Sequence, residues 1–175
     1  PTQTASVSAA VQSLLTELKV CVEAPEQLDQ AAGSCAHWYA KEFSIEHDPS
    51  AVQGETNHFR YVPLKRLLVR ADNMSDTELA MLLIAAATAG VPVDISASEK
   101  RAITGVEVTI ESDQALAQRL VDTTTDYASL RAPGASDTLH RAANEATLQL
   151  IDSKVLANAR IELTHYFREQ SISEC

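Results

Sequence analysis

The chain has 175 residues, of which 45% are hydrophobic and 22% are charged, and its formal net charge is −10. This composition is ordinary for one globular domain, and the negative charge disfavours nucleic acid and anionic membranes, because both would repel the chain. No apolar run approaches the roughly 20 residues that cross a bilayer, so we expect no membrane partner. The three cysteines, Cys21, Cys35 and Cys175, form no close pair, which favours a reducing compartment, and we expect a cytoplasmic protein.

Two amphipathic helices are predicted at the N-terminus. Apolar residues recur at helical spacing in the first of them, and they are Val7, Val11, Leu14, Leu15, Leu18 and Val22. The second helix begins at Pro25, a favoured first-turn residue, and Glu26 and Asp29 complement its positive end. A polar loop over 44–58 follows, so residues 1–53 are assigned to an N-terminal helical pair with its loop.

Residues 54–66 are predicted to form a small β-flap arm. The run Phe59-Arg60-Tyr61-Val62 is aromatic and β-branched, as strands are, and Pro63 stops it. The run is either an edge strand or an arm that pairs outside the core sheet.

The segment 67–96 predicts a strand, a helix and a second strand. The apolar run at 67–69 is typical of a strand covered on both faces. Ser75 and Glu78 form a capping box at the helix start, and Gly90 suits a left-handed helix end. One apolar stripe of the helix is expected to face a sheet, and it consists of Leu79, Leu82, Leu83, Ala86 and Gly90. A crossover helix implies that the two strands are parallel.

The remaining chain continues the alternation of strand and helix. Further strands are predicted at 106–110, 128–132 and 148–151, with helices after Ser112 and Ser136 and from about Asn158. The last helix is expected to carry Leu163, Tyr166, Phe167 and Gln170 on one face, and a short sixth strand is expected at 171–173. Residues 67–175 are therefore predicted to form a Rossmann-like, doubly wound, mostly parallel α/β domain with strand order 3-2-1-4-5 and the third strand at an edge.

The sequence contains only weak motifs for catalysis or for binding a cofactor or metal. The turn after the first core strand, 70–74, has no glycine, whereas a dinucleotide site normally has a glycine-rich turn there. The turn 133–136 offers a helix start to an anion, but Asp137 would repel phosphate, which favours an ordinary turn. Cys21 and Cys35 are best explained as core thiols. The scattered acidic cluster Glu42, Glu46, His47 and Asp48 has no defined ligand spacing, so we predict no catalytic, cofactor-binding or metal site.

Several segments together resemble the C-terminal aldehyde dehydrogenase-superfamily domain of PutA-type enzymes, in which proline dehydrogenase is fused to L-glutamate-γ-semialdehyde (pyrroline-5-carboxylate) dehydrogenase. These segments are the run 38–60, WYAKEFSIEHDPSAVQGETNHFR, the run 59–64, the run 89–93, AGVPV, and the run 160–173. The family's catalytic cysteine with its glycine-rich flank has no match here, and neither do its FAD and NAD contacts.

The resemblance implies a Rossmann-like domain with a protruding β-flap. It also implies that such a domain covers the tunnel between two active sites by mimicking an oligomer contact. The parent chain would then use FAD and NAD, and its catalytic domains would be this segment's partners. The interface candidates are Phe59, Arg60, Tyr61, Val62, Phe167, Arg168, Glu169 and Gln170.

Two other functions stay open from the residues alone. A doubly wound domain is compatible with an independent nucleotide-binding enzyme, although the missing glycine turn speaks against it. A free-standing dimerisation module is also compatible, since an extended aromatic arm can add to the sheet of a partner, including a second copy of the chain.

Overall fold

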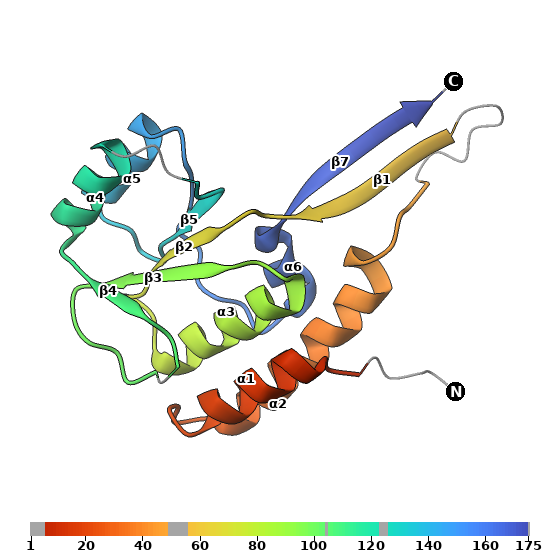
Figure 1. Cartoon of the computed structure of the whole chain (residues 1–175), viewed down its shortest axis with the longest axis horizontal. Helices are drawn as coiled ribbons and strands as arrows, with labels where there is room; N and C mark the ends of the chain where they lie inside the picture. Colours follow the sequence, from red (N-terminus) through yellow and green to blue (C-terminus); the bar gives the residue numbers. More distant parts are fainter. Residues whose placement is uncertain (1–5, 49–55, 104, 123–125, 175) are drawn as a thin grey trace.

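The protein is described by a computed structural model that covers residues 6–48, 56–103, 105–122 and 126–174. A five-stranded parallel sheet lies at its centre, in the order β4-β3-β2-β5-β6 (Figure 1). Its strands are β2 (Leu67–Arg70), β3 (Val93–Ala97), β4 (Val108–Ile110), β5 (Ser129–Arg131) and β6 (Gln149–Ile151). Counted along the domain, this is the predicted order 3-2-1-4-5, so the doubly wound α/β prediction is confirmed.

Helices cover both faces of the sheet. On one face lie α4 (Asp113–Asp122) and α5 (Asp137–Glu145), whose apolar residues pack with Leu68 and Leu130. On the other face lies α3 (Asp76–Ala89), which packs with Leu67 and Val69. Successive residues of β2 therefore pack in opposite cores, which explains the continuous apolar run at 67–69.

The β2-α3-β3 unit follows the local signals in the sequence. The Ser75 hydroxyl accepts a hydrogen bond from the amide of Glu78, and the Glu78 carboxylate accepts one from the amide of Ser75. Gly90 ends the helix in the left-handed region, at φ 71°. At each end of the helix, neighbouring residues therefore satisfy part of the free backbone groups.

Removal of the cap is expected to weaken the domain modestly. Ser75→Ala deletes the acceptor for the Glu78 amide, and we expect it to lower the free energy of unfolding by about 1 kcal/mol. Urea denaturation followed by circular dichroism measures this change. Ser13→Ala, an exposed replacement inside helix α1 (Ala9–Lys19), is the control and is expected to leave the stability nearly unchanged. Equal losses in the two variants would contradict the capping role.

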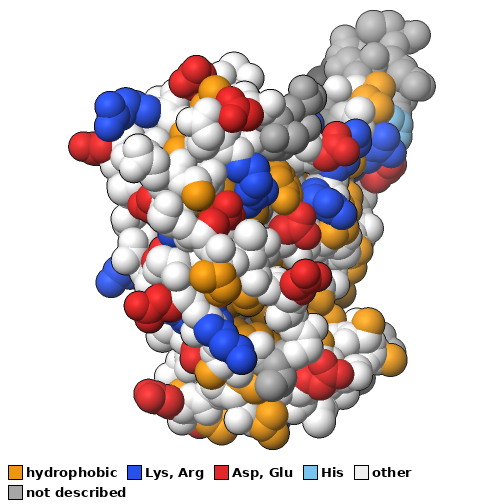
Figure 2. Space-filling model, turned by 60° about the vertical axis from the view of Figure 1, so that its left-hand side comes forward, with side chains coloured by type: hydrophobic (Ala, Val, Ile, Leu, Met, Phe, Trp, Pro, Cys, Tyr) orange, Lys and Arg blue, Asp and Glu red, His pale blue; other side chains and the backbone are white. Residues whose placement is uncertain are grey.

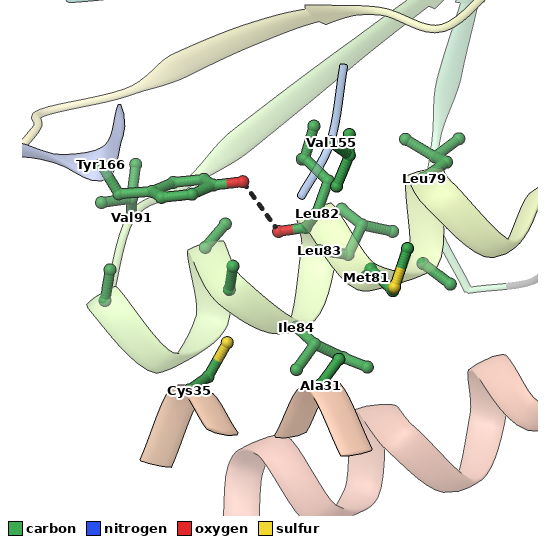
Figure 3. Close-up of a cluster of buried hydrophobic side chains, with 14 of the residues drawn as sticks. Ala31, Cys35, Leu79, Met81, Leu82, Leu83, Ile84, Val91, Val155 and Tyr166 are labelled. Atoms are coloured by element: carbon green, nitrogen blue, oxygen red, sulfur yellow. Dashed lines mark hydrogen bonds between the residues drawn. The ribbon is translucent and has the colours of Figure 1, made fainter. Parts of the chain in front are cut away.

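The helix α3 is buried on more sides than its predicted stripe. Its buried residues are Leu79, Ala80, Met81, Leu82, Leu83, Ile84, Ala85, Ala86 and Ala89. The sheet-facing side meets Val155 and Tyr166, while Ala31 and Cys35 of α2 (Pro25–Trp38) approach the opposite side (Figure 3). The residues of the predicted stripe in α3 are buried, and other residues of the helix are buried as well, because α1 and α2 form an additional layer over the outer side of α3 (Figure 1).

The C-terminal part differs most from the sequence-based prediction. The last helix, α6 (Ala159–Leu163), is short, and a 3-10 turn over Thr164–Tyr166 follows it. Phe167 and Gln170 therefore do not lie on a helix: they belong to β7 (Phe167–Glu174), which pairs antiparallel with β1 (Thr56–Pro63). The predicted sixth strand at 171–173 is a strand, but it lies outside the core sheet, because β1 supplies its hydrogen-bonding partners.

The described helices include none that is both long and apolar enough to cross a membrane. Of the predicted loop 44–58, residues 49–55 lie outside the described residues.

Candidate functional site

The structure brings all eight interface candidates into one two-stranded ribbon, β1–β7, which we call the arm. Arg60 lies opposite Gln170, Tyr61 opposite Glu169, and Val62 opposite Arg168. The arm projects from the body beside α6, and its tip points away from the sheet (Figure 1). Segments about 110 positions apart in the sequence thus form one surface.

The two faces of the arm differ in chemistry. Because side chains alternate along a strand, Arg60, Val62, Arg168 and Gln170 share the outer face. Arg60 Nε donates to Gln170 Oε1 at 2.7 Å across the ribbon. Arg168 is exposed and Val62 is 38% exposed, so this face is basic and partly apolar in a chain of negative net charge.

The inner face of the arm is aromatic and is attached to the body. The Phe43 ring, in the π-helical turn after α2, lies 4.6 Å from the Tyr61 ring and 5.0 Å from the Phe167 ring, centroid to centroid. His47 exchanges two backbone hydrogen bonds of 2.8 Å with Phe59. Rings within about 4.5–7 Å attract each other, so this cluster fixes the root of the arm. Sequence patterns did not predict the contact of Phe43 with the arm, although the apolar character of Phe43 was a signal.

A hollow of about 800 Å³, which we call the root hollow, lies between the arm and the body. It is lined by Trp38, Lys41, Glu42, Glu46, His47, Asp48, Phe59, Tyr61 and Arg160. Acidic, basic and histidine side chains gather near the projecting arm, whereas charges of both signs are interspersed over the body (Figure 2). Within the described residues, no group of three or more His, Cys, Asp or Glu side chains has the arrangement of a metal site.

Arg160 and Glu42 make the main ion pair of the root hollow. Arg160 Nε donates to Glu42 Oε2 at 2.7 Å, and Nη2 donates to Oε1 at 3.3 Å. The hydrogen bond from Arg160 lowers the pKa of Glu42 below its usual value. The Arg160 guanidinium also lies 5.2 Å from the centre of the Trp38 ring. Local sequence patterns do not predict this pair, because its members are 118 positions apart.

The crevice beyond the carboxyl ends of β2 and β5 is where doubly wound proteins bind nucleotides. Here Arg70 reaches across it, donating to Ser96 Oγ at 2.8 Å and pairing with Asp72 at 2.7 Å and Asp113 at 3.0 Å. Ser136 stands at the start of α5, as predicted, but its hydroxyl donates to Asp113 at 2.6 Å and makes no capping bond. The crevice is therefore bridged by the protein's own polar groups, and two carboxylates in it oppose a phosphate.

The buried thiol of Cys35 is unsuited to nucleophilic chemistry. Burial, together with the nearby charge of Glu162, raises the pKa of Cys35 to about 12. Cys21 is less buried, and its Sγ contacts the carbonyl oxygen of Glu17 at 3.6 Å. Cys175 lies outside the described residues. Because the thiolate is the reactive form, Cys35 is expected to be inert in the folded chain.

Alkylation tests this expectation. When the folded chain is treated with iodoacetamide at neutral pH, peptide mass spectrometry is expected to show label at Cys21 but not at Cys35. Addition of urea is expected to make Cys35 react at a rate comparable to that of Cys21. Rapid labelling of Cys35 without denaturant would show that the contact between α2 and α3 opens readily.

A second buried polar network joins β5 to α6. The side chains of Arg131 and Glu162 are 1% and 2% exposed, and Arg131 Nη2 lies 3.1 Å from Glu162 Oε2. Glu162 also accepts hydrogen bonds from the Leu156 amide at 2.9 Å and from the Tyr166 hydroxyl at 3.1 Å. Burial raises the pKa of Glu162, and Arg131 opposes that shift. This network holds the turn from which β7 leaves the body.

His165, next to this network, is expected to make stability depend on pH. Burial, with the charge of Arg131 adding to it, lowers the pKa of His165 from 6.5 to about 4. The unfolded chain binds a proton more readily at this ring, so the folded chain loses stability as the pH falls from 6.5 toward 4. NMR titration is expected to place the His165 midpoint near pH 4. The urea midpoint of His165→Gln is expected to fall less over this range, and an equal fall would contradict the assignment.

Comparison with known proteins reveals the fold class. Neither protein-family models nor curated protein sequences match the chain. Among solved structures, proline utilization A (PutA) from Corynebacterium freiburgense aligns with 99% of this chain at 26% identity and a TM-score of 0.63. A variant of PutA from Bradyrhizobium japonicum aligns with 85% of the chain at 16% identity and a TM-score of 0.55. Staphylococcus aureus AldH in a substrate-bound state also aligns with 85%, at 15% identity and a TM-score of 0.58.

These likenesses show that the chain has the Rossmann-like α/β fold found in the aldehyde dehydrogenase superfamily. The match spans 15% of the C. freiburgense protein, 19% of the B. japonicum protein and 41% of S. aureus AldH. The chain therefore corresponds to a part of each of these proteins.

Proposed function

We propose that the chain is a non-catalytic, aldehyde dehydrogenase-like domain of a PutA-type bifunctional enzyme. In this role it covers the aldehyde dehydrogenase domain, or the tunnel that carries the intermediate from one active site to the other. The catalytic domains of the parent chain would oxidise proline with FAD and the semialdehyde with NAD. The chain itself supplies a packing surface, since closing a cavity retains an intermediate without adding a reacting group.

The observation that carries this proposal is the likeness to C. freiburgense PutA, which extends over 99% of the chain at 26% identity. Two features of the structure support a non-catalytic role. The crevice at the strand ends is bridged by Arg70 with Asp72 and Asp113, and the Cys35 thiol is buried. The arm supplies an extended surface whose outer face is accessible to a partner.

Truncation of the complete gene product is the direct test. The complete reading frame that encodes this chain is expressed with and without residues 1–175 of the chain. We expect both half-reactions to survive in the truncated protein, while NADH formation from proline acquires a lag because the intermediate escapes to solvent. Coupled progress curves without a lag, or a reading frame without dehydrogenase domains, would contradict the proposal.

A charge-reversal variant tests the role of the arm without removing the domain. Arg60→Glu combined with Arg168→Glu reverses the charge of the arm's outer face, and we expect it to produce the same lag with unchanged half-reactions. The control is Arg141→Glu combined with Lys100→Glu, which changes the net charge equally at exposed positions of the body. A lag in the control but not in the arm variant would place the covering surface elsewhere.

A nucleotide-binding enzyme is the main alternative, and the isolated chain distinguishes it. Calorimetric titration with NAD is expected to give no saturable heat up to millimolar concentration, because Arg70 is paired with Asp72 and Asp113 and these two carboxylates, which line the crevice, repel a phosphate. Saturable binding would favour the alternative.

A dimerisation module is supported by one observation. Val62 and Ile172, both 38% exposed, lie on the outer face of the arm, where a second copy of the chain can cover them. Light scattering on the isolated chain tests this function, and a mass corresponding to one chain at all concentrations would exclude it.

A further inference from the structure

We draw no further inference here: the strongest candidate, the apolar groove where the start of α1 meets the ends of α2 and α3, whose lining includes Val7, Val11, Ala36 and Tyr39, carries none, because nothing in the described part of the structure shows what covers it.

Discussion

Replacement of Glu162 by alanine is expected to lower the free energy of unfolding by about 3–5 kcal/mol. The change leaves the Arg131 guanidinium buried without its counter-ion, and it removes the acceptor for the Leu156 amide and the Tyr166 hydroxyl. Desolvated groups without partners cost far more than an exposed ion pair contributes. Urea denaturation followed by circular dichroism measures the effect.

A double variant separates the buried charge from the packing. In Arg131→Met combined with Glu162→Gln, no charge is left in the site. The single accepting oxygen of glutamine can serve the Leu156 amide, while its NH2 group can donate to the Tyr166 hydroxyl, which can itself donate to the Leu82 carbonyl oxygen. We expect this variant to recover most of the stability that Glu162→Ala loses. If the double variant is as unstable as the single one, packing at this site and not the unpaired charge of Arg131 explains the loss.

The second large effect is expected for Phe43→Ala, which should lower the free energy of unfolding by about 3–5 kcal/mol. The Phe43 side chain is 3% exposed and contacts the rings of Tyr61 and Phe167, so its removal leaves a cavity between the body and the arm. The variant is expected to destabilise the arm in particular, in addition to lowering the stability of the whole fold. Hydrogen exchange by mass spectrometry is expected to show faster exchange of β1 and β7 amides, with α3 amides less affected.

Tyr61→Phe is the matched control for the aromatic cluster. It keeps the ring that contacts Phe43 and removes only the hydroxyl, which interacts with Glu42. We expect this variant to lower the free energy of unfolding by less than about 1.5 kcal/mol and to leave the amide hydrogen exchange of β1 and β7 nearly unchanged. Unchanged arm exchange in Phe43→Ala would show that the cluster does not attach the arm to the body.

Local patterns in the sequence were sufficient for the β2-α3-β3 unit. The capping box at Ser75 and the left-handed Gly90 act over a few residues, so their effect does not depend on the rest of the fold. The apolar run at 67–69 in β2 likewise predicts a strand that is buried on both faces. The strand order could be predicted because a chain of alternating strands and helices can adopt only a few topologies.

The segment 164–174 shows where local patterns were insufficient. Its apolar residues at Tyr166 and Phe167 were compatible with a helix face, yet β7 is extended and pairs with β1. The sequence predicted a strand only at 171–173, and the pairing with the distant strand β1 determines that β7 already begins at Phe167. The outer burial of α3 was missed for the same reason, because α2 supplies the covering surface.

By itself, the sequence determined the fold class, the order of the core strands and the extended run at 59–62. It did so because helix ends, strand alternation and aromatic runs are short-range features. Only the tertiary structure decided that Phe59–Val62 and Phe167–Gln170 form one ribbon, that Phe43 anchors it, and that Arg160 meets Glu42 in the root hollow. These contacts join segments separated by up to 124 positions, and their free energy becomes available only after the chain has closed the intervening loops.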